Sequence, residues 1–307
     1  MKPYDLIIIG GGPAGIGAAL QAGREGRKVM LAEKDILGGR LNHAFWVKNF
    51  PLAGPNGCSG KTIVRGLVEQ LKTLDIWTIH GTCQTIAPKG GCFVSLVNGR
   101  SYNSRAVILA GGLEPKKLLI PGAGEAFEQQ RLVYYWDDLP GPLKDKSIAV
   151  IGGGEVALDQ ACSLAAKGDK VMVLVRGDKV KAYPGLIKMA EDLGVKIKYC
   201  FATEWISLNG PELVLHGSEN RNIKCDRAVV AIGASVPKTI ISVQAKKHMN
   251  KGLYLAGDLA NKNHKQAAIA FGSGVKAAML ADLTLYPSPN TSTGSVTLGE
   301  GGIKRSK

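Results

Sequence analysis

The chain has 307 residues, of which 45% are hydrophobic, and this length predicts about two domains with cores of their own. No stretch approaches the roughly 18 uninterrupted apolar residues of a membrane helix, and the N-terminus enters a predicted strand without a cleavable signal pattern. We therefore expect a cytoplasmic protein. The net charge of +14 favours acidic partners or anionic ligands, but the lysines are scattered, so a generally basic surface explains it equally well. No nucleic-acid, membrane or metal site is predicted.

A nucleotide-binding pattern occupies the stretch from Tyr4 to Glu33. Its apolar run at 6–9 is typical of a buried parallel strand. The helix that follows begins at Pro13, which leaves its free N–H groups and positive dipole end available to phosphate. A second strand ends at Glu33, whose carboxylate can accept hydrogen bonds from ribose hydroxyls. Between the strand and the helix, three glycines stand in the G-x-G-x-x-G register of a dinucleotide site: Gly10, Gly12 and Gly15.

The next part of the chain predicts a loop, a helix and further strands. The loop covers 36–51, and residues 61–74 place apolar side chains along one helical face. A strand that ends at a glycine pair, 111–112, indicates another point of ligand approach, and the proline- and glycine-rich stretch 115–122 is interpreted as a linker between domains. The strands are expected at 76–86, 92–97 and 105–109.

The opening pattern repeats after the linker. A strand is predicted at 147–151, Gly152 and Gly154 occupy motif positions, and Ala157 replaces the third glycine at the start of a helix. A second mononucleotide-binding fold is the natural interpretation.

The second motif lacks the ribose acid of the first. Glu33 lies 23 residues after Gly10, whereas 23 residues after Gly152 stands Val175, followed by Arg176. A cation beside the place of the acid can accommodate a 2′-phosphate, so NADPH is favoured over NADH. The alternative for Arg176 is a solvated charge at a strand end. Two further cations that can assist the phosphate role are Lys179 and Lys181.

The last third predicts a return to the first domain. After a helix at 186–193 and several short strands, one strand ends at Gly233. Another, at 252–256, ends in Gly257 and Asp258, and this aspartate can bond a ribityl chain or a phosphate. A helix is expected at 265–285. From 286 onward the sequence is polar and aperiodic, which indicates a tail.

This layout resembles the low-molecular-weight thioredoxin reductase family of flavoproteins. The resemblance implies an α/β fold with two Rossmann-like dinucleotide-binding domains in three ββα layers, bound FAD, NADPH and a homodimer. It also implies an FAD domain made of 1–117 and 246–286, an NAD(P)H domain at 118–245, and a flexible tail at 287–307. The motifs that carry the resemblance are Gly10 to Gly15, Gly38-Gly39 with Asn49-Phe50-Pro51, Ala110-Gly111-Gly112, Ile151 to Gly154, Ala231-Ile232-Gly233, Ala256-Gly257-Asp258 and Lys265-Gln266-Ala267.

The resemblance also assigns site residues. It places the FAD pyrophosphate on the first glycine motif and the adenosine ribose on Glu33. The flavin end is implied to lie near Asn49, Asp258, Gln266 and Ala267. The predicted FAD residues are Gly10, Gly12, Pro13, Ala14, Gly15, Glu33, Lys34, Gly39, Arg40, Leu41, Asn49, Ala110, Gly111, Gly257, Asp258, Gln266 and Ala267. The predicted NADP residues are Gly152, Gly154, Glu155, Val156, Arg176, Lys181 and Gly233.

One departure from the family bears on function. Thioredoxin reductases carry a Cys-x-x-Cys just before the second glycine motif, where a dithiol relays electrons. Here the corresponding place, 133–138, reads Val-Tyr-Tyr-Trp-Asp-Asp. The six cysteines are never closer than nine positions apart, and Cys83 and Cys92, which a predicted hairpin could bring together, are interpreted as reduced packing residues. The bacilliredoxin reductase relatives place a cysteine where this chain has Ala14.

A flavin without a thiol relay suits a one-electron carrier. The thioredoxin-reductase-like ferredoxin NADP reductases lack the dithiol, and the stretch from Gly154 to Asp159 is similar to their Gly-Asp-Ser-Ala-x-Asp. Their C-terminal extension covers the flavin, a role for which 286–292 is a candidate. An acidic ferredoxin or flavodoxin would fit the basic chain. Three aromatic residues either shield the flavin or fill the interface between domains: Tyr134, Tyr135 and Trp136.

The first hypothesis is therefore an FAD enzyme that moves electrons between NADPH and a small redox protein. The second keeps disulfide chemistry of the thioredoxin type, with an external thiol or protein donor as relay. The third is a flavin-binding sensor without turnover. The connection between Gly233 and Gly252 is shorter than is usual in the family, and Gly177 stands where an arginine is expected, so a degenerate nicotinamide site is a further alternative.

Overall fold

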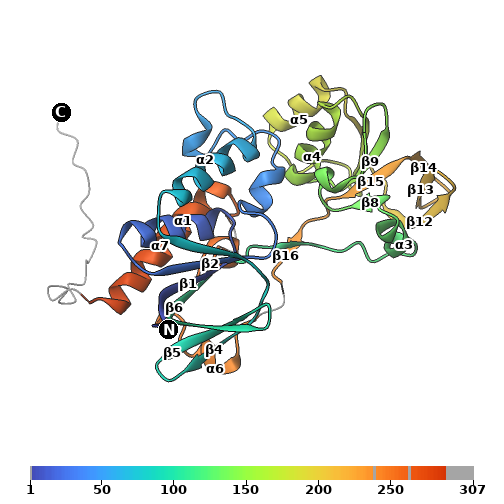
Figure 1. Ribbon diagram of the computed structural model, residues 1–307. Helices are drawn as coiled ribbons and strands as arrows, with labels where there is room; N and C mark the ends of the chain where they lie inside the picture. The colour runs from blue at the N-terminus through green and yellow to red at the C-terminus, as the bar shows by residue number, and fades with distance from the viewer. Residues whose placement is uncertain (1, 238–239, 262–263, 288–307) are drawn as a thin grey trace, which may run out of the picture.

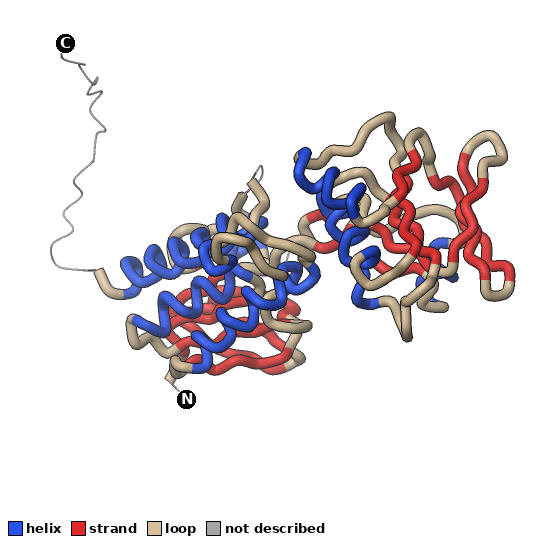
Figure 2. Tube along the Cα trace, turned by 90° about the horizontal axis from the view of Figure 1, so that it is seen from above, coloured by secondary structure: helices blue, strands red, loops and turns tan. Residues whose placement is uncertain are grey.

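The computed structural model describes residues 2–237, 240–261 and 264–287. Within these residues the chain forms two α/β units joined by a narrow connection (Figure 1). The two chain crossings, β7 (Glu114–Pro115) and β16 (Ala234–Ser235), pair antiparallel as a short ribbon. Seen from above, the longer helices of the first unit lie side by side across its sheet (Figure 2).

The first unit is built on a seven-stranded sheet with the order β3-β2-β1-β6-β5-β4, in which β17 also pairs with β6. The second half of β6 is parallel to β1 and β17, whereas its first half is antiparallel to β5, so two layers share this strand. The strands are β1 (Tyr4–Ile9), β2 (Val29–Glu33), β3 (Ile76–His80), β4 (Cys83–Lys89), β5 (Cys92–Val97), β6 (Arg100–Leu109) and β17 (Leu253–Leu255).

The strand expected at 76–86 is wrong as a single element, because β3 ends at His80 and β4 begins at Cys83. The break lies at Gly81, whose N–H donates to the carbonyl of Glu33 and whose Cα faces Val97 so closely that a Cβ would lie 2.7 Å from it. The chain therefore leaves the parallel layer at this glycine and enters the antiparallel one.

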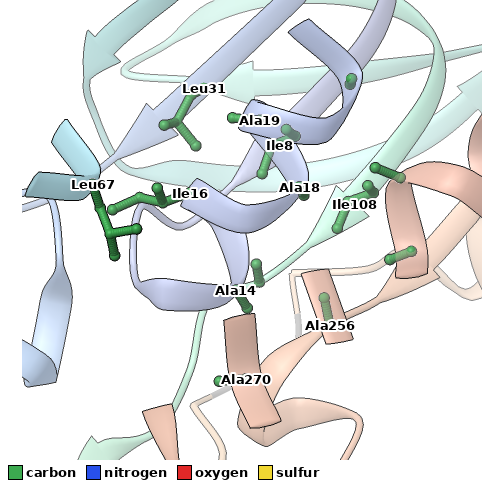
Figure 3. Packing of buried hydrophobic residues seen from close by; sticks show 14 of the residues in the cluster. Ile8, Ala14, Ile16, Ala18, Ala19, Leu31, Leu67, Ile108, Ala256 and Ala270 are labelled. Atoms are coloured by element: carbon green, nitrogen blue, oxygen red, sulfur yellow. The ribbon is translucent and has the colours of Figure 1, made fainter. Parts of the chain in front are cut away.

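Three helices cover the parallel layer: α1 (Pro13–Arg24), α2 (Gly60–Lys72) and α7 (Ala267–Leu285). The backbones of α1 and α7 approach each other closely, since a Cβ on Gly274 would lie 1.8 Å from the carbonyl oxygen of Ala14. Alanines fill the rest of this contact, and Figure 3 shows Ala14, Ala256 and Ala270 gathered beside the core around Ile8 and Ile108. Small side chains thus bring α7 close to the first glycine motif.

By length and composition α7 also meets the criteria for a membrane-crossing helix. Its most apolar 18-residue window has a mean hydropathy of 1.3, and 28% of that window is buried. One such helix is weak evidence for a membrane span. Its Asp282 pairs with Arg27 of the chain after α1 at 2.5 Å. We therefore describe α7 as a packing helix of the first unit.

The second unit repeats the layers of the first. Its parallel sheet has the order β11-β10-β9-β15-β8, and β12, β13 and β14 form an antiparallel sheet beside it. The strands are β8 (Leu132–Val133), β9 (Ser147–Ile151), β10 (Lys170–Leu174), β11 (Lys196–Lys198), β12 (Thr203–Asn209), β13 (Glu212–Gly217), β14 (Asn222–Cys225) and β15 (Arg227–Val230). The helices are α3 (Ala123–Glu128), α4 (Glu155–Ala165) and α5 (Pro184–Asp192).

After β16 the chain packs again on the first unit. Ile240 and Ile241 belong to the cluster around Ile86 of β4, and α6 (Val243–Lys246) buries Ala245 in the same cluster. The chain thus contacts the first unit a few residues before 246, where the second segment of the FAD domain is expected to begin. We propose that this segment begins closer to β16.

Candidate dinucleotide sites

The first glycine motif has the close approaches that the pattern predicts. Gly10 ends β1 with φ +102°, and a Cβ on it would lie 2.4 Å from the carbonyl oxygen of Ala110. A Cβ on Gly15 would lie 1.7 Å from the carbonyl oxygen of Gly10. In contrast, a Cβ on Gly12, the N-cap of α1, would meet nothing within 4 Å. The space above Gly12 and the free N–H groups at this helix end fit a pyrophosphate.

Glu33 stands at the end of β2 beside this motif. Its Oε2 accepts a hydrogen bond of 2.5 Å from the N–H of Gly11, and its Oε1 accepts one of 2.8 Å from the N–H of Asp35. The carboxylate is thus held at the carboxyl end of the sheet, where a ribose would lie if it follows the pyrophosphate.

The flavin end of the predicted site brings together Arg40 and Asp258. The guanidinium of Arg40, in the 3-10 helix η1 (Gly39–His43), lies 3.7 Å from the carboxylate of Asp258 in η4 (Gly257–Leu259). Burial raises the pKa of Asp258, although Arg40 and Lys265 act in the opposite direction. Both side chains therefore offer charged groups at the end of β17, within reach of a ribityl chain or phosphate.

The remaining predicted FAD residues lie in several different parts of the first unit. Lys34 forms an ion pair of 2.8 Å with Glu114 at the edge of the unit, and Asn49 is exposed in the loop before the 3-10 helix η2 (Pro51–Ala53). Gln266 is the N-cap of α7. The others lie at the ends of β1, β6 and β17 or in the adjoining helices: Pro13, Ala14, Gly39, Leu41, Gly111, Gly257 and Ala267.

The second motif has the same geometry. Gly152 ends β9 with φ +150°, and a Cβ on it would lie 2.3 Å from the carbonyl oxygen of Ala231. A Cβ on Gly154, the N-cap of α4, would meet nothing within 4 Å, as at Gly12 of the first motif. Glu155 and Val156 form the exposed first turn of α4 beside it.

Two of the predicted cations adjoin this motif. Arg176 is exposed two residues after β10 and forms no ion pair with any residue that the structure describes. The N–H of Lys181 donates a hydrogen bond of 2.6 Å to the carbonyl of Gly153. Gly233 lies at the chain crossing, where its carbonyl accepts from the N–H of Lys116. The contact of Lys181 with the motif supports its predicted place near a phosphate.

The predicted aromatic residues take two different positions. The hydroxyl of Tyr134 accepts a hydrogen bond of 3.1 Å from the N–H of Leu118, and its ring packs in the second unit. Tyr135 stacks on His43 of the first unit with ring centroids 3.9 Å apart, and the indole N–H of Trp136 donates to the carbonyl of His43. Tyr135 and Trp136 thus fill the interface between the units.

Charged groups complete this interface. The Nδ1 of His43 lies 2.5 Å from Asp137, and the ammonium of Lys61 lies 3.2 Å from the same carboxylate. Burial works to raise the pKa of Asp137, but His43 and Lys61 outweigh it, so the pKa is lowered. From α4, the carboxylate of Asp159 accepts a hydrogen bond of 3.0 Å from the N–H of Phe45.

Asp159 is the most perturbed carboxyl of the interface. Burial raises its pKa to about 6, against the hydrogen bonds that it accepts from the backbone of Phe45 and Trp46. The sequence placed Asp159 in a motif of the second unit but gave no sign that it reaches the first. The roles of His43 and Lys61 were also missed, since neither residue is one of those that carry the family resemblance.

All six cysteines are free thiols. In the antiparallel pairing of β4 with β5, Cys83 lies opposite Val97 and Cys92 lies opposite Lys89. The two cysteines therefore do not face each other across the hairpin. The segment proposed to cover a flavin, 286–292, lies mostly outside the described residues. Its first residue, Tyr286, donates to Asp5 at the start of β1, the end of the strand away from Gly10.

A model of the pyridine nucleotide-disulphide oxidoreductase family matches residues 4–274. The chain belongs to this family. The oxidoreductase is 29% identical over 299 residues to the thioredoxin reductase of Ureaplasma parvum, with 91% of this chain and 96% of the relative covered. It is 26% identical over 316 residues to ferredoxin–NADP reductase 2 of Listeria innocua, with 94% and 95% covered.

Among solved structures, the thioredoxin reductase of Lactococcus lactis in its FR conformation matches with a TM-score of 0.81 at 24% identity, covering 92% of this chain and 99% of that chain. The predicted resemblance and the fold of two Rossmann-like units are confirmed. The chain is an oxidoreductase of the FAD- and NADPH-dependent kind expected from its sequence. The roles of the individual site residues stay predictions.

Proposed function

We propose that this oxidoreductase moves electrons between NADPH and a small redox protein through FAD, without a dithiol of its own. The observation that carries the proposal is the segment at 133–138, where the family resemblance expects two redox cysteines. It holds Tyr135, Trp136, Asp137 and Asp138, and these side chains carry no sulfur. Three of them instead contact the first unit through His43.

The proposed roles of the protein groups follow from their positions. The N-terminus of α1 and Gly12 hold the FAD pyrophosphate, Glu33 accepts from the ribose, and Asp258 with Arg40 positions the ribityl and phosphate groups. In the second unit, Gly154 and the N-terminus of α4 hold the NADPH pyrophosphate. The 2′-phosphate is held by two cations: Arg176 and Lys181. When bound, FAD supplies a centre that accepts a hydride and can pass electrons on singly.

The partner follows from charge and from the relatives. One relative is named a ferredoxin–NADP reductase, and a net charge of +14 would favour an acidic carrier such as a ferredoxin or flavodoxin. A second candidate is a thioredoxin-like partner, with an external thiol or protein donor as relay, because another relative is named a thioredoxin reductase. Cytoplasmic location remains a prediction.

We also propose a homodimer. Helix α7 carries three exposed apolar side chains on the side away from its small buried residues: Met279, Leu280 and Leu283. Exposed apolar residues that gather on one helix are typical of a surface that a partner covers.

An anaerobic titration of the purified yellow protein tests the main proposal. We expect NADPH to bleach the visible flavin band stoichiometrically, at a much lower concentration than NADH. The reduced protein is then mixed with ferredoxin, flavodoxin or thioredoxin, and the return of the band is timed. Rapid reoxidation by thioredoxin alone would favour the second candidate. No bleaching by either nucleotide would contradict the reductase proposal. It would favour a flavoprotein that receives electrons from a protein donor, or one that has no catalytic turnover.

A further inference from the structure

A cavity lies away from both dinucleotide sites. It has a volume of about 510 Å³ and opens between the β4–β5 hairpin, the chain after α6 and the end of α7. Arg105, in its wall, lies beside Asp5 at the beginning of β1. The first glycine motif follows the opposite end of this six-residue strand, about 20 Å away at the usual rise of a strand. The cavity therefore is separate from the predicted cofactor sites.

Four basic residues are among those that line this cavity. Lys89 comes from β4, Arg105 from β6, and His248 and Lys251 from the chain after α6. Among the described residues that line the cavity, none is acidic. Neither lysine forms an ion pair with a described residue. Such a concentration of one charge in a concave site attracts anions, because the cavity walls focus the field.

Two of these side chains are held in place. The guanidinium of Arg105 donates a hydrogen bond of 2.9 Å to the carbonyl of Leu285 and lies 3.4 Å from Asp5, the nearest carboxylate. The ring of His248 meets Phe93 edge to face, with centroids 5.6 Å apart. Both side chains therefore lose little freedom when a ligand binds, which favours affinity.

The hairpin adds backbone groups to this wall. Lys89 and Cys92 pair across a two-residue turn, and the residues of the turn, Gly90 and Gly91, have φ of +58° and +77°.

We propose that this cavity is a binding site for a small, multiply charged phosphate-bearing anion. Its volume lies in the range of small-molecule sites, about 300–1,000 Å³. Lys89, Arg105 and Lys251 line one cavity, whereas a nucleic acid is bound by cations spread along a face or stripe. The site does not depend on the electron-transfer function proposed above.

Binding of inorganic pyrophosphate to the FAD-loaded protein tests the site. Calorimetric titration is carried out with saturating NADP⁺, so that the phosphate positions of the dinucleotide sites are filled. We expect one pyrophosphate per chain, and about tenfold or greater weakening in the double variant K89Q/K251Q, since each lysine supplies a charge-assisted hydrogen bond. The control K188Q/K224Q removes the same charge from exposed lysines of the second unit and should bind as the wild type does.

Cys92 gives an independent readout, because its half-buried thiol lines the cavity, while the exposed Cys200 lies in the second unit. Pyrophosphate should slow alkylation of Cys92, measured by peptide mass spectrometry, and leave that of Cys200 unchanged. The proposal is overturned by absence of binding at millimolar pyrophosphate, by equal weakening in the control variant, or by binding that leaves Cys92 unprotected. Duplex DNA that protects Cys92 better than pyrophosphate would also contradict it.

Discussion

The imidazole Nδ1 of His43 lies 2.5 Å from the Oδ1 of Asp137, and this contact joins the two nucleotide-binding units. Asp137 lies within the segment where the family resemblance expects a redox dithiol. In this chain the segment binds one unit to the other, since the adjacent Tyr135 stacks on the same imidazole. Where the resemblance expects a redox dithiol, this chain has residues that join the two units.

Replacing Asp137 with asparagine should weaken this interface. The substitution removes the charge that pairs with Lys61, whose ammonium lies 3.2 Å from Asp137, and it replaces the carboxylate that contacts His43. Loss of one partner from such a half-buried cluster costs about 1–3 kcal/mol. We expect lower thermal stability and faster proteolysis at the ribbon of β7 and β16. The control D192N breaks an exposed pair with Lys188 and should change neither measurement; equal effects in the two variants would contradict the argument.

Asp159 should make stability depend on pH. Burial raises its folded-state pKa to about 6, above the ordinary value of 3.8. The folded state therefore binds the proton of Asp159 more tightly than the unfolded state does. The contribution of protonated Asp159 to stability is full below about pH 3.8 and is lost as pH rises through 6. The shift corresponds to at most about 3 kcal/mol.

We expect the variant D159N to show a smaller fall in urea midpoint between pH 4.5 and 7 than the wild type. The amide oxygen of the asparagine can still accept from the N–H of Phe45. Asp169, whose pKa burial also raises to about 6, should retain its own share of the fall. The control D192N should keep the full slope, and an unchanged slope in D159N would show that Asp159 ionises normally.

The sequence predicted those parts of the fold that depend on local pattern. Gly10, Gly152 and Glu33 lie where their spacing placed them, because a glycine turn at a strand end has few alternative geometries. The contact of His43 with Asp137 was not predictable, since it joins η1 to a segment 94 residues away. The break at Gly81 was also missed, because apolar residues continue on both sides of it.

Arg176 should determine the preference for NADPH. Replacing it with glutamine removes the charge proposed to hold the 2′-phosphate, so the KM for NADPH should rise about tenfold while the KM for NADH stays the same. Steady-state rates with both nucleotides measure this change. The matched control is R100Q, on the exposed β5–β6 turn of the first unit. If the KM values for NADPH and NADH rise equally, Arg176 acts on the fold of the second unit and not on the phosphate.

Reduction of an artificial acceptor should not require cysteine. All six thiols are free, and none lies in the segment at 133–138. Alkylation of the native protein with iodoacetamide should therefore leave the NADPH-dependent reduction of ferricyanide within about twofold of the untreated rate, because hydride transfer to a flavin needs few protein groups. A loss that follows modification of one cysteine, with the flavin spectrum intact, would restore a thiol to the mechanism.

The exposed face of α7 should hold the proposed homodimer together. Leu283 is 52% exposed and Met279 is 51% exposed, one turn apart on the helix. The double variant M279D/L283D places two carboxylates on this face, and burying them in a dimer would cost several kcal/mol, so we expect a monomer in light scattering coupled to size exclusion. Val243, 72% exposed on α6, provides the control V243D, which should stay dimeric. A wild-type monomer at micromolar concentration would exclude the dimer, and a dimeric double variant would move its interface to another face of the protein.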